Sequence, residues 1–251
     1  MVKTRTAENV AFDLDRFNTE GFVVLEKLFD ESAVGALREA ATALESACGP
    51  LVHENPRVRI DVIGGSARPK KIEPLIDVSG AFKQLTRDSR ILEIMRTIFG
   101  EEPVLFEDKL NYKYPRGGGE FALHQDRWYW ATIPTRQIVS VLIYLDDATL
   151  ENGCLEVFPQ AHKQGLFEMD PKKGIAESRF AGRPPLKAVG PAGTMIVFDS
   201  LTPHLSRENH SEKFRRAIIF SYNPQSDGCY YDQGCGQARD QHLAWMKTQK
   251  S

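Results

Sequence analysis

The strongest constraint on the fold is a series of short apolar segments in the second half of the chain. Each segment is rich in β-branched or aromatic residues and is bounded by Gly, Pro, Asp or Asn, the pattern of buried strands between turns. Four of these segments cover residues 138–147, 153–159, 193–199 and 215–223. A further alternating segment at 104–114 precedes them. Many short strands joined by turns predict a β-sandwich or a barrel.

The first hundred residues have a helical pattern instead. The region 14–29 predicts a short helix, a turn at Gly21 and then a strand. Amphipathic helices are predicted over 30–48 and 88–99, each with a polar cap residue at its start and a Gly at its end. The stretch 50–74 is rich in Pro, Gly and charged residues and is interpreted as a loop. We expect the helices to pack on one outer face of the β-structure.

The 251 residues fit one domain, because a single β or α/β domain can reach about that length. We expect helical support over about 12–100, a β core over about 101–224 and a C-terminal tail over 225–251. Within the core, 163–190 is long, polar and poor in strand pattern, which predicts a lid-like insertion.

Composition excludes several classes of partner. The 32 Lys and Arg residues are balanced by 34 Asp and Glu residues, so there is no electrostatic reason to expect a nucleic acid or an anionic membrane. No apolar run approaches the ~18–20 residues of a membrane span, and the N-terminal residues lack the apolar stretch of a secretory signal. The four cysteines form no CxxC pair and are too few for a disulfide scaffold. We therefore expect a cytoplasmic protein, with monomer and dimer both open.

Three side chains carry the first chemical signal. His124 and Asp126 are separated by one residue, so on a strand both would point to the same face. His204 follows about 80 residues later, after an apolar segment. Two histidines and one carboxylate form the facial triad of non-haem Fe(II) oxygenases. His-x-Asp alone is weak evidence, since most such pairs are surface or structural residues.

A buried arginine carries the second signal. Arg215 lies 11 residues after His204, at the start of an apolar strand, where an unpaired charge would be costly. A dicarboxylate cosubstrate would bind it with two hydrogen bonds, and Ser206 could add a hydroxyl to the same carboxylate. The alternative is a structural salt bridge to an acidic residue. Arg216 falls on the other face of the strand by alternation.

Several stretches together resemble the phytanoyl-CoA dioxygenase family of Fe(II)/2-oxoglutarate-dependent oxygenases. They are FNTEGFVVLEKLFDESAVGALR, NYKYPRGGG, HQD at 124–126, LDDATLENGCLEVFPQAHKQG at 146–165 and HLSRENHSEKFRRA at 204–217. These segments extend from about residue 14 to 224. The family pattern of His-x-Asp, a distal His and an Arg 11 residues later is complete in this sequence.

The resemblance implies a double-stranded β-helix, or jelly-roll, core flanked by N-terminal helices. It implies that His124, Asp126 and His204 bind Fe(II). It further implies that Arg215 and Ser206 hold the far carboxylate of 2-oxoglutarate, whose other end chelates the iron. Asn111 and Gln125 are further candidates for contact with the cosubstrate. For each of them the alternative is a purely structural role.

Two positions depart from relatives. Leu142 stands on the strand after His-x-Asp where some relatives carry an aromatic residue, so that wall of the site differs from theirs. His162 follows Pro159-Gln160-Ala161 where the family usually has Pro-Gly-Ser, and we interpret it as a structural loop residue.

The implied reaction consumes O₂ and 2-oxoglutarate, releases succinate and CO₂, and hydroxylates an unactivated C–H bond of a small molecule. Desaturation, epoxidation or cyclisation at the same iron centre stay open, and so does an acyl-CoA substrate. A different class is a non-catalytic jelly-roll binding protein, against which the complete ligand set argues. Halogenating relatives replace the carboxylate ligand with a small residue, so Asp126 argues against chlorination.

Substrate contacts are the least constrained part of the sequence. The segment RWYWATIP follows the triad, and Trp128, Tyr129 and Trp130 could enclose an apolar or ring substrate, although some of them could simply pack in the core. Five basic residues could meet an anionic group of the substrate or could form an ordinary solvated face: Arg68, Lys70, Lys71, Lys109 and Lys113. We expect a specialised metabolite or an amino-acid-like compound.

Overall fold

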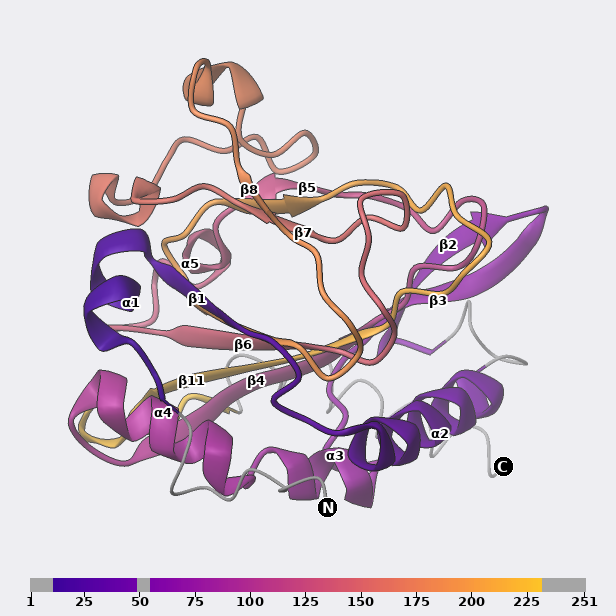
Figure 1. Cartoon of the computed structure of the whole chain (residues 1–251), viewed down its shortest axis with the longest axis horizontal. Coiled ribbons are helices and arrows are strands. Elements are labelled where there is room, and N and C mark those ends of the chain that lie inside the picture. The colour runs from indigo at the N-terminus through magenta and orange to yellow at the C-terminus, as the bar shows by residue number, and fades with distance from the viewer. Residues whose placement is uncertain (1–10, 49–54, 232–251) are drawn as a thin grey trace.

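Two antiparallel sheets face each other and enclose the interior of the molecule (Figure 1). The computed structural model describes residues 11–48 and 55–231. The larger sheet has seven strands in the order β1-β9-β6-β11-β4-β3-β2, and the smaller has four in the order β5-β10-β7-β8. This arrangement confirms the predicted jelly-roll core. Most of the predicted tail, 232–251, lies outside the described residues.

The strand boundaries follow the apolar segments. The larger sheet contains β1 (Phe22–Leu25), β2 (Val58–Ile63), β3 (Ser66–Ile72), β4 (Pro103–Asn111), β6 (Val139–Tyr144), β9 (Met195–Asp199) and β11 (Ala217–Pro224). The smaller sheet contains β5 (Phe121–His124), β7 (Leu155–Val157), β8 (Leu186–Ala188) and β10 (His204–Ser206). All pairings between these strands are antiparallel.

Helices α2 (Glu31–Cys48), α3 (Gly80–Leu85) and α4 (Ser89–Phe99) cover the outer face of the larger sheet, as predicted (Figure 1). Helix α1 (Leu14–Glu20) lies beside β1 at one end of the two sheets, and a short α5 (Asp126–Tyr129) follows β5. Three short 3₁₀ segments complete the described structure: η3 (Ala161–Gln164), η4 (Glu177–Phe180) and η5 (Gln225–Asp227). Among the described residues, no helix has the length and apolar character needed to cross a membrane.

Alternation along the central strands produces two apolar layers. In β6, Val141 and Ile143 pack with the helices, whereas Leu142 and Tyr144 face the space between the sheets. Because this strand is buried on both faces, its sequence is a nearly continuous run of apolar residues. The helices therefore support one face of the sheet and leave the other face free for the site.

The predicted loop at 50–74 is wrong in its second half. Residues 58–72 form the β2–β3 hairpin, with Gly64 and Gly65 at its turn. Both glycines have positive φ, the conformation that a tight hairpin turn requires. Charged residues on this edge hairpin conceal the strand pattern, because much of its surface faces solvent.

The segment 163–190 packs on the small sheet. Met169, Ile175 and Phe180 are buried with Leu123 and Leu205, and Ile175 N donates a 2.7 Å hydrogen bond to Leu123 O. None of the described residues of 163–190 lines the cavity between the sheets. The structure therefore places this segment against the small sheet, outside the lining of the cavity.

Candidate active site

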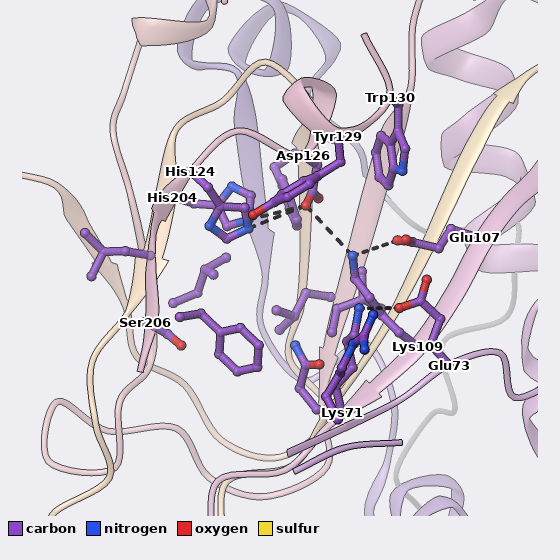
Figure 2. Close-up of a pocket in the computed structure, with 18 of the residues that line it drawn as sticks. Lys71, Glu73, Glu107, Lys109, His124, Asp126, Tyr129, Trp130, His204 and Ser206 are labelled. Carbon is purple, nitrogen blue, oxygen red and sulfur yellow. Dashed lines mark hydrogen bonds and ion pairs between the residues drawn. The ribbon is translucent and has the colours of Figure 1, made fainter. Parts of the chain in front are cut away.

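Strand pairing brings the two predicted histidines together. His124 ends β5 and His204 begins β10, and these two residues are register partners in the small sheet. Asp126 begins the short helix α5 and is not on the strand, so the predicted same-face geometry of His-x-Asp is wrong. The turn into α5 instead directs the carboxylate toward both rings (Figure 2). The predicted convergence therefore occurs by a different local geometry.

Each histidine presents one ring nitrogen to the same point. His124 Nδ1 lies 2.7 Å from Ala122 O, and His204 Nδ1 lies 2.9 Å from Thr202 O. A carbonyl oxygen accepts only from a protonated nitrogen, so these contacts assign the proton to Nδ1 and leave the Nε2 lone pair free. The Nε2 atoms lie 3.6 and 4.0 Å from Asp126 Oδ1. Fixing the outer nitrogen in this way is the usual arrangement for a metal-binding histidine.

The protonation states of the triad suit a cation. Burial, with His124 close by, lowers the pKa of His204 to about 4, so its imidazole is neutral at pH 7. Burial opposes ionisation of Asp126, but Lys109 and the two histidines outweigh it and hold the pKa of this carboxyl far below its usual range. Ligand atoms of His124, Asp126 and His204 all lie within 4.8 Å of one another. Two imidazoles and one carboxylate so placed fit a facial triad for Fe(II).

The triad opens into a cavity of about 880 Å³ between the two sheets. Arg215, Ser206 and Asn111 line the same cavity. Apolar residues from both sheets form much of the remaining wall: Leu142, Leu155, Phe198, Leu205 and Ile219. Polar and charged residues form most of the rest of the lining, so the cavity combines apolar surface with many polar groups that converge on it.

Arg215 has the environment expected for an anion-binding residue. Its side chain is 2% exposed, and its Nη2 donates to Ser206 Oγ at 3.2 Å. Its Nε has no hydrogen-bond partner, and no carboxylate of the described residues forms an ion pair with it. Burial lowers the pKa of its guanidinium, which shows how poorly the protein alone compensates this charge. The structural salt bridge that the sequence left open is therefore not formed, whereas Arg216 pairs with Asp146 at 2.8 Å.

Asn111 also has an unused polar atom. It ends β4 and lines the cavity, and its buried Oδ1 has no partner. Buried polar atoms in folded proteins are nearly always hydrogen-bonded, so this amide is available for a bound molecule.

Gln125 and Lys113 are placed away from the cavity. The Gln125 amide donates to Gly165 O and Leu201 O and accepts from Phe167 N, so it braces neighbouring loops and has no atom free for a cosubstrate. The Lys113 ammonium donates to the carbonyls of Gly119, Ser206 and Arg207. Neither side chain lines the cavity, so the structure gives both a supporting role in place of the predicted contact.

The aromatic segment after the triad divides between the cavity and the core. Tyr129 is exposed, lines the cavity, and has its ring centroid 6.0 Å from that of His124. Trp130 lines the cavity too, but its ring packs edge-on against Phe106 at 4.8 Å. Trp128 packs beside the small-sheet cluster that contains Leu123 and does not line the cavity. Of the predicted basic residues only Lys71 and Lys109 reach the cavity wall.

Sequence reasoning missed four charged residues of the cavity, namely Arg57, Arg59, Glu73 and Glu107. Alternation would have found one of them, since Glu107, Lys109 and Asn111 share one face of β4. The other three belong to the 50–74 region that was interpreted as a loop.

The jelly-roll, the facial triad and the unpaired buried arginine together define an Fe(II)- and 2-oxoglutarate-dependent oxygenase. The family model described as Phytanoyl-CoA dioxygenase (PhyH) matches residues 17–217. The chain therefore belongs to the phytanoyl-CoA dioxygenase family, as the resemblance predicted.

Relatives and solved structures support this assignment. A methylphosphonate hydroxylase from Gimesia maris is 31% identical over 216 residues, 86% of this chain and 81% of the relative. A 2-aminoethylphosphonate dioxygenase from an uncultured bacterium is 31% identical over 160 residues, 63% of this chain and 60% of the relative. A crystal structure of EctD from S. alaskensis with 2-oxoglutarate and 5-hydroxyectoine has a TM-score of 0.73 at 25% identity, and the match covers 85% of this chain and 76% of that chain.

Proposed function

We propose that His124, Asp126 and His204 hold Fe(II) and that Arg215 and Ser206 bind the far carboxylate of 2-oxoglutarate. The observation that carries this proposal is the buried Arg215, which lacks an acidic partner and lines the same cavity as the triad. A carboxylate can accept two hydrogen bonds from one guanidinium and would supply the missing charge. The Asn111 amide is the further polar contact that we assign to the cosubstrate.

The protein's own residues orient the reactants and keep the site dry. Bound iron with 2-oxoglutarate and O₂ supplies the oxidising chemistry. Leu142, Phe198 and Ile219 surround this part of the cavity with apolar surface and exclude water from it. The hydrogen bonds at Nδ1 fix both imidazoles, so the open face of the triad points consistently into the cavity.

The reaction that we propose is hydroxylation of an unactivated C–H bond. Asp126 occupies the carboxylate position, which leaves no room for a halide ligand and opposes halogenation. Desaturation, epoxidation and cyclisation remain the alternatives, because they need the same residues.

A screen for compounds that stimulate succinate formation, followed by product analysis under ¹⁸O₂, tests this proposal. Hydroxylation predicts one labelled oxygen atom in the product and one in succinate. A product that has lost two hydrogens and carries no label would replace hydroxylation with desaturation or ring closure. Succinate formation that no compound stimulates in a broad metabolite pool would contradict the assignment to a small-molecule oxygenase.

We also propose that the enzyme works in the cytoplasm, without a nucleic-acid or membrane partner. The near balance of 32 basic and 34 acidic residues supports this, as do the unpaired cysteines Cys48, Cys154 and Cys229. Fractionation of cells that express the enzyme would test the location.

A further inference from the structure

Four charged side chains form the cavity wall opposite the histidines. Lys71 is on β3, Glu73 follows that strand directly, and Glu107 and Lys109 lie on β4. Figure 2 shows them across the open space from His124 and His204, with Lys109 reaching toward Asp126. We call these four residues the charged wall. The chemistry already assigned to iron and 2-oxoglutarate uses none of its members directly.

Each lysine of the charged wall lies against one of its glutamates. Lys109 Nζ lies 2.6 Å from Glu107 Oε2, and Lys71 is paired with Glu73. Burial raises the pKa of Glu107 to about 8, so this carboxyl is mostly protonated at neutral pH. Burial works against ionisation of Glu73, but Lys71 and Lys109 outweigh it and hold its pKa below the usual range. Two ammonium groups and one ionised carboxylate, that of Glu73, therefore share one small area.

Stability alone does not explain this arrangement. Ion pairs removed from water are weak contributors to stability, because desolvation offsets their attraction. Apolar side chains of similar size would serve the fold at least as well. The charged wall moreover faces a cavity that also holds the metal ligands, where perturbed groups usually indicate function.

The pairing of Lys71 with the ionised Glu73 defines what the wall can bind. A bare anion at Lys71 would displace Glu73 and leave that carboxylate without its counter-charge, which is costly in a buried site. A bare cation at Glu73 would isolate Lys71 in the same way. A molecule that carries both charges gives each displaced group a new partner. We propose that the substrate is a small zwitterion, with its acid group against Lys71 and Lys109 and its ammonium group against Glu73. This proposal rests on the proposed function.

Two further positions fit this substrate class. Arg59 is exposed at the cavity and forms no ion pair with the described residues, so it can attract the acid group to the site. Lys109 Nζ lies only 3.8 Å from Asp126 Oδ1, so an acid group bound there is close to the iron ligands. The carbon that reacts is therefore within a few bonds of the charged groups, and the substrate is short.

Calorimetric titration of the anaerobic enzyme, loaded with Fe(II) and 2-oxoglutarate, tests this substrate class. The probes are ω-aminoalkyl acids with one to four carbons between the charges, the same acids without the amino group, and the same amines without the acid group. Each acid is used as phosphonate and as carboxylate, which distinguishes the two sources of the acid group. At least one aminoalkyl acid should bind about tenfold more tightly than both of its single-charge counterparts.

Variants connect this preference to the charged wall. Glu73→Gln should weaken the best aminoalkyl acid to about the affinity of its amino-free counterpart, without weakening the latter. Lys71→Met should weaken both acids by about tenfold. Glu102→Gln is the matched control: this exposed carboxylate pairs with Arg96 outside the cavity, and its removal should change none of the dissociation constants.

Each contrary outcome has a clear meaning. An amino-free acid that binds as tightly as the aminoalkyl acid would make the wall an anion site and overturn the proposal. An amine without the acid group that binds as tightly as the aminoalkyl acid would also overturn it. So would a result in which no aminoalkyl acid binds more tightly than both of its single-charge counterparts. The visible charge-transfer band of iron-bound 2-oxoglutarate separates the two proposals. A normal band without a zwitterion preference rejects only the substrate class, whereas absence of the band from the wild-type enzyme rejects the iron site itself.

Discussion

Two adjacent arginines have opposite environments, which allows a paired prediction at the residue scale. Arg215 is buried without an acidic partner, whereas Arg216 forms an ion pair with Asp146 at 2.8 Å. In the metal-free and cosubstrate-free enzyme, Arg215→Met should raise the free energy of unfolding by about 1 kcal/mol, because an uncompensated buried charge is removed. Arg216→Met should lower it, because Asp146 loses its partner. Urea unfolding measures both; destabilisation by both substitutions would contradict the account of Arg215.

The same substitution should impair cosubstrate binding. Arg215→Met removes the only cation that we assign to the far carboxylate of 2-oxoglutarate. The concentration of 2-oxoglutarate at half-saturation, followed by anaerobic titration, should rise by about tenfold or more. Ser206→Ala should cause a smaller rise, since it removes one neutral hydroxyl. An unchanged requirement in Arg215→Met would remove this residue from its proposed role.

The buried carboxyl of Glu107 should make the free energy of unfolding depend on pH. Burial raises the pKa of Glu107 to about 8 in the folded protein, above its ordinary value of 4.5. Between these values the folded state binds a proton that the unfolded state does not, so this group's contribution to stability is lost as pH rises. Gln cannot titrate, so Glu107→Gln should gain stability relative to wild type from pH 5 to pH 8, by on the order of 1 kcal/mol or more. Unfolding midpoints at several pH values measure this; a constant difference would contradict it.

The candidate ligands could be predicted from sequence because His-x-Asp, a distal His and an Arg 11 residues later together form a specific family pattern. His124, Asp126, His204 and Arg215 all lie in the cavity region where the resemblance implied. Gln125 could not be assigned in this way, because its partners are backbone atoms of loops about 40 and 76 residues away. Lys113 is similar: three carbonyl oxygens satisfy its ammonium, and no sequence pattern reveals such a cage.

At the scale of elements, the turn before β7 depends on a glycine. Gly153 has φ +76, and a Cβ atom there would lie 2.1 Å from Arg207 O, just after β10. Gly153→Ala should therefore lower the free energy of unfolding by about 1–3 kcal/mol. Gly64 in the β2–β3 turn also has positive φ, but its Cβ position is open, so Gly64→Ala isolates the cost of the backbone conformation. Thermal unfolding of both variants measures the difference. Equal destabilisation would mean that the contact with Arg207 does not matter.

Strands with one clear environment were predictable, and the edge hairpin was not. β6, β9 and β11 are buried over their whole length, and continuous apolar runs identify them. The β2–β3 hairpin is an edge of the larger sheet with mixed burial, so its charged residues resemble a loop. This error affects the description of the site, because the hairpin region contributes Arg59, Lys71 and Glu73 to the cavity.

At the scale of the whole molecule, the two sheets have distinct roles. The small sheet and helix α5 supply the three proposed iron ligands, and strands of the large sheet and the residues next to them supply Arg215 and the charged wall. Sequence predicted the two layers and the helical support, because hydrophobic alternation encodes them. It could not predict the width of the cavity or the pairing of charges across it, since these depend on contacts between distant segments.

Visible absorption after anaerobic addition of Fe(II) and 2-oxoglutarate is the decisive measurement of the iron site. A weak metal-to-ligand charge-transfer band is expected in the wild-type enzyme and should be lost in His124→Ala, Asp126→Ala and His204→Ala. Glu102→Gln, which alters a carboxylate outside the cavity, should keep the band. A band of normal intensity in the three ligand variants, or no band in the wild-type enzyme, would contradict the assignment of the iron site.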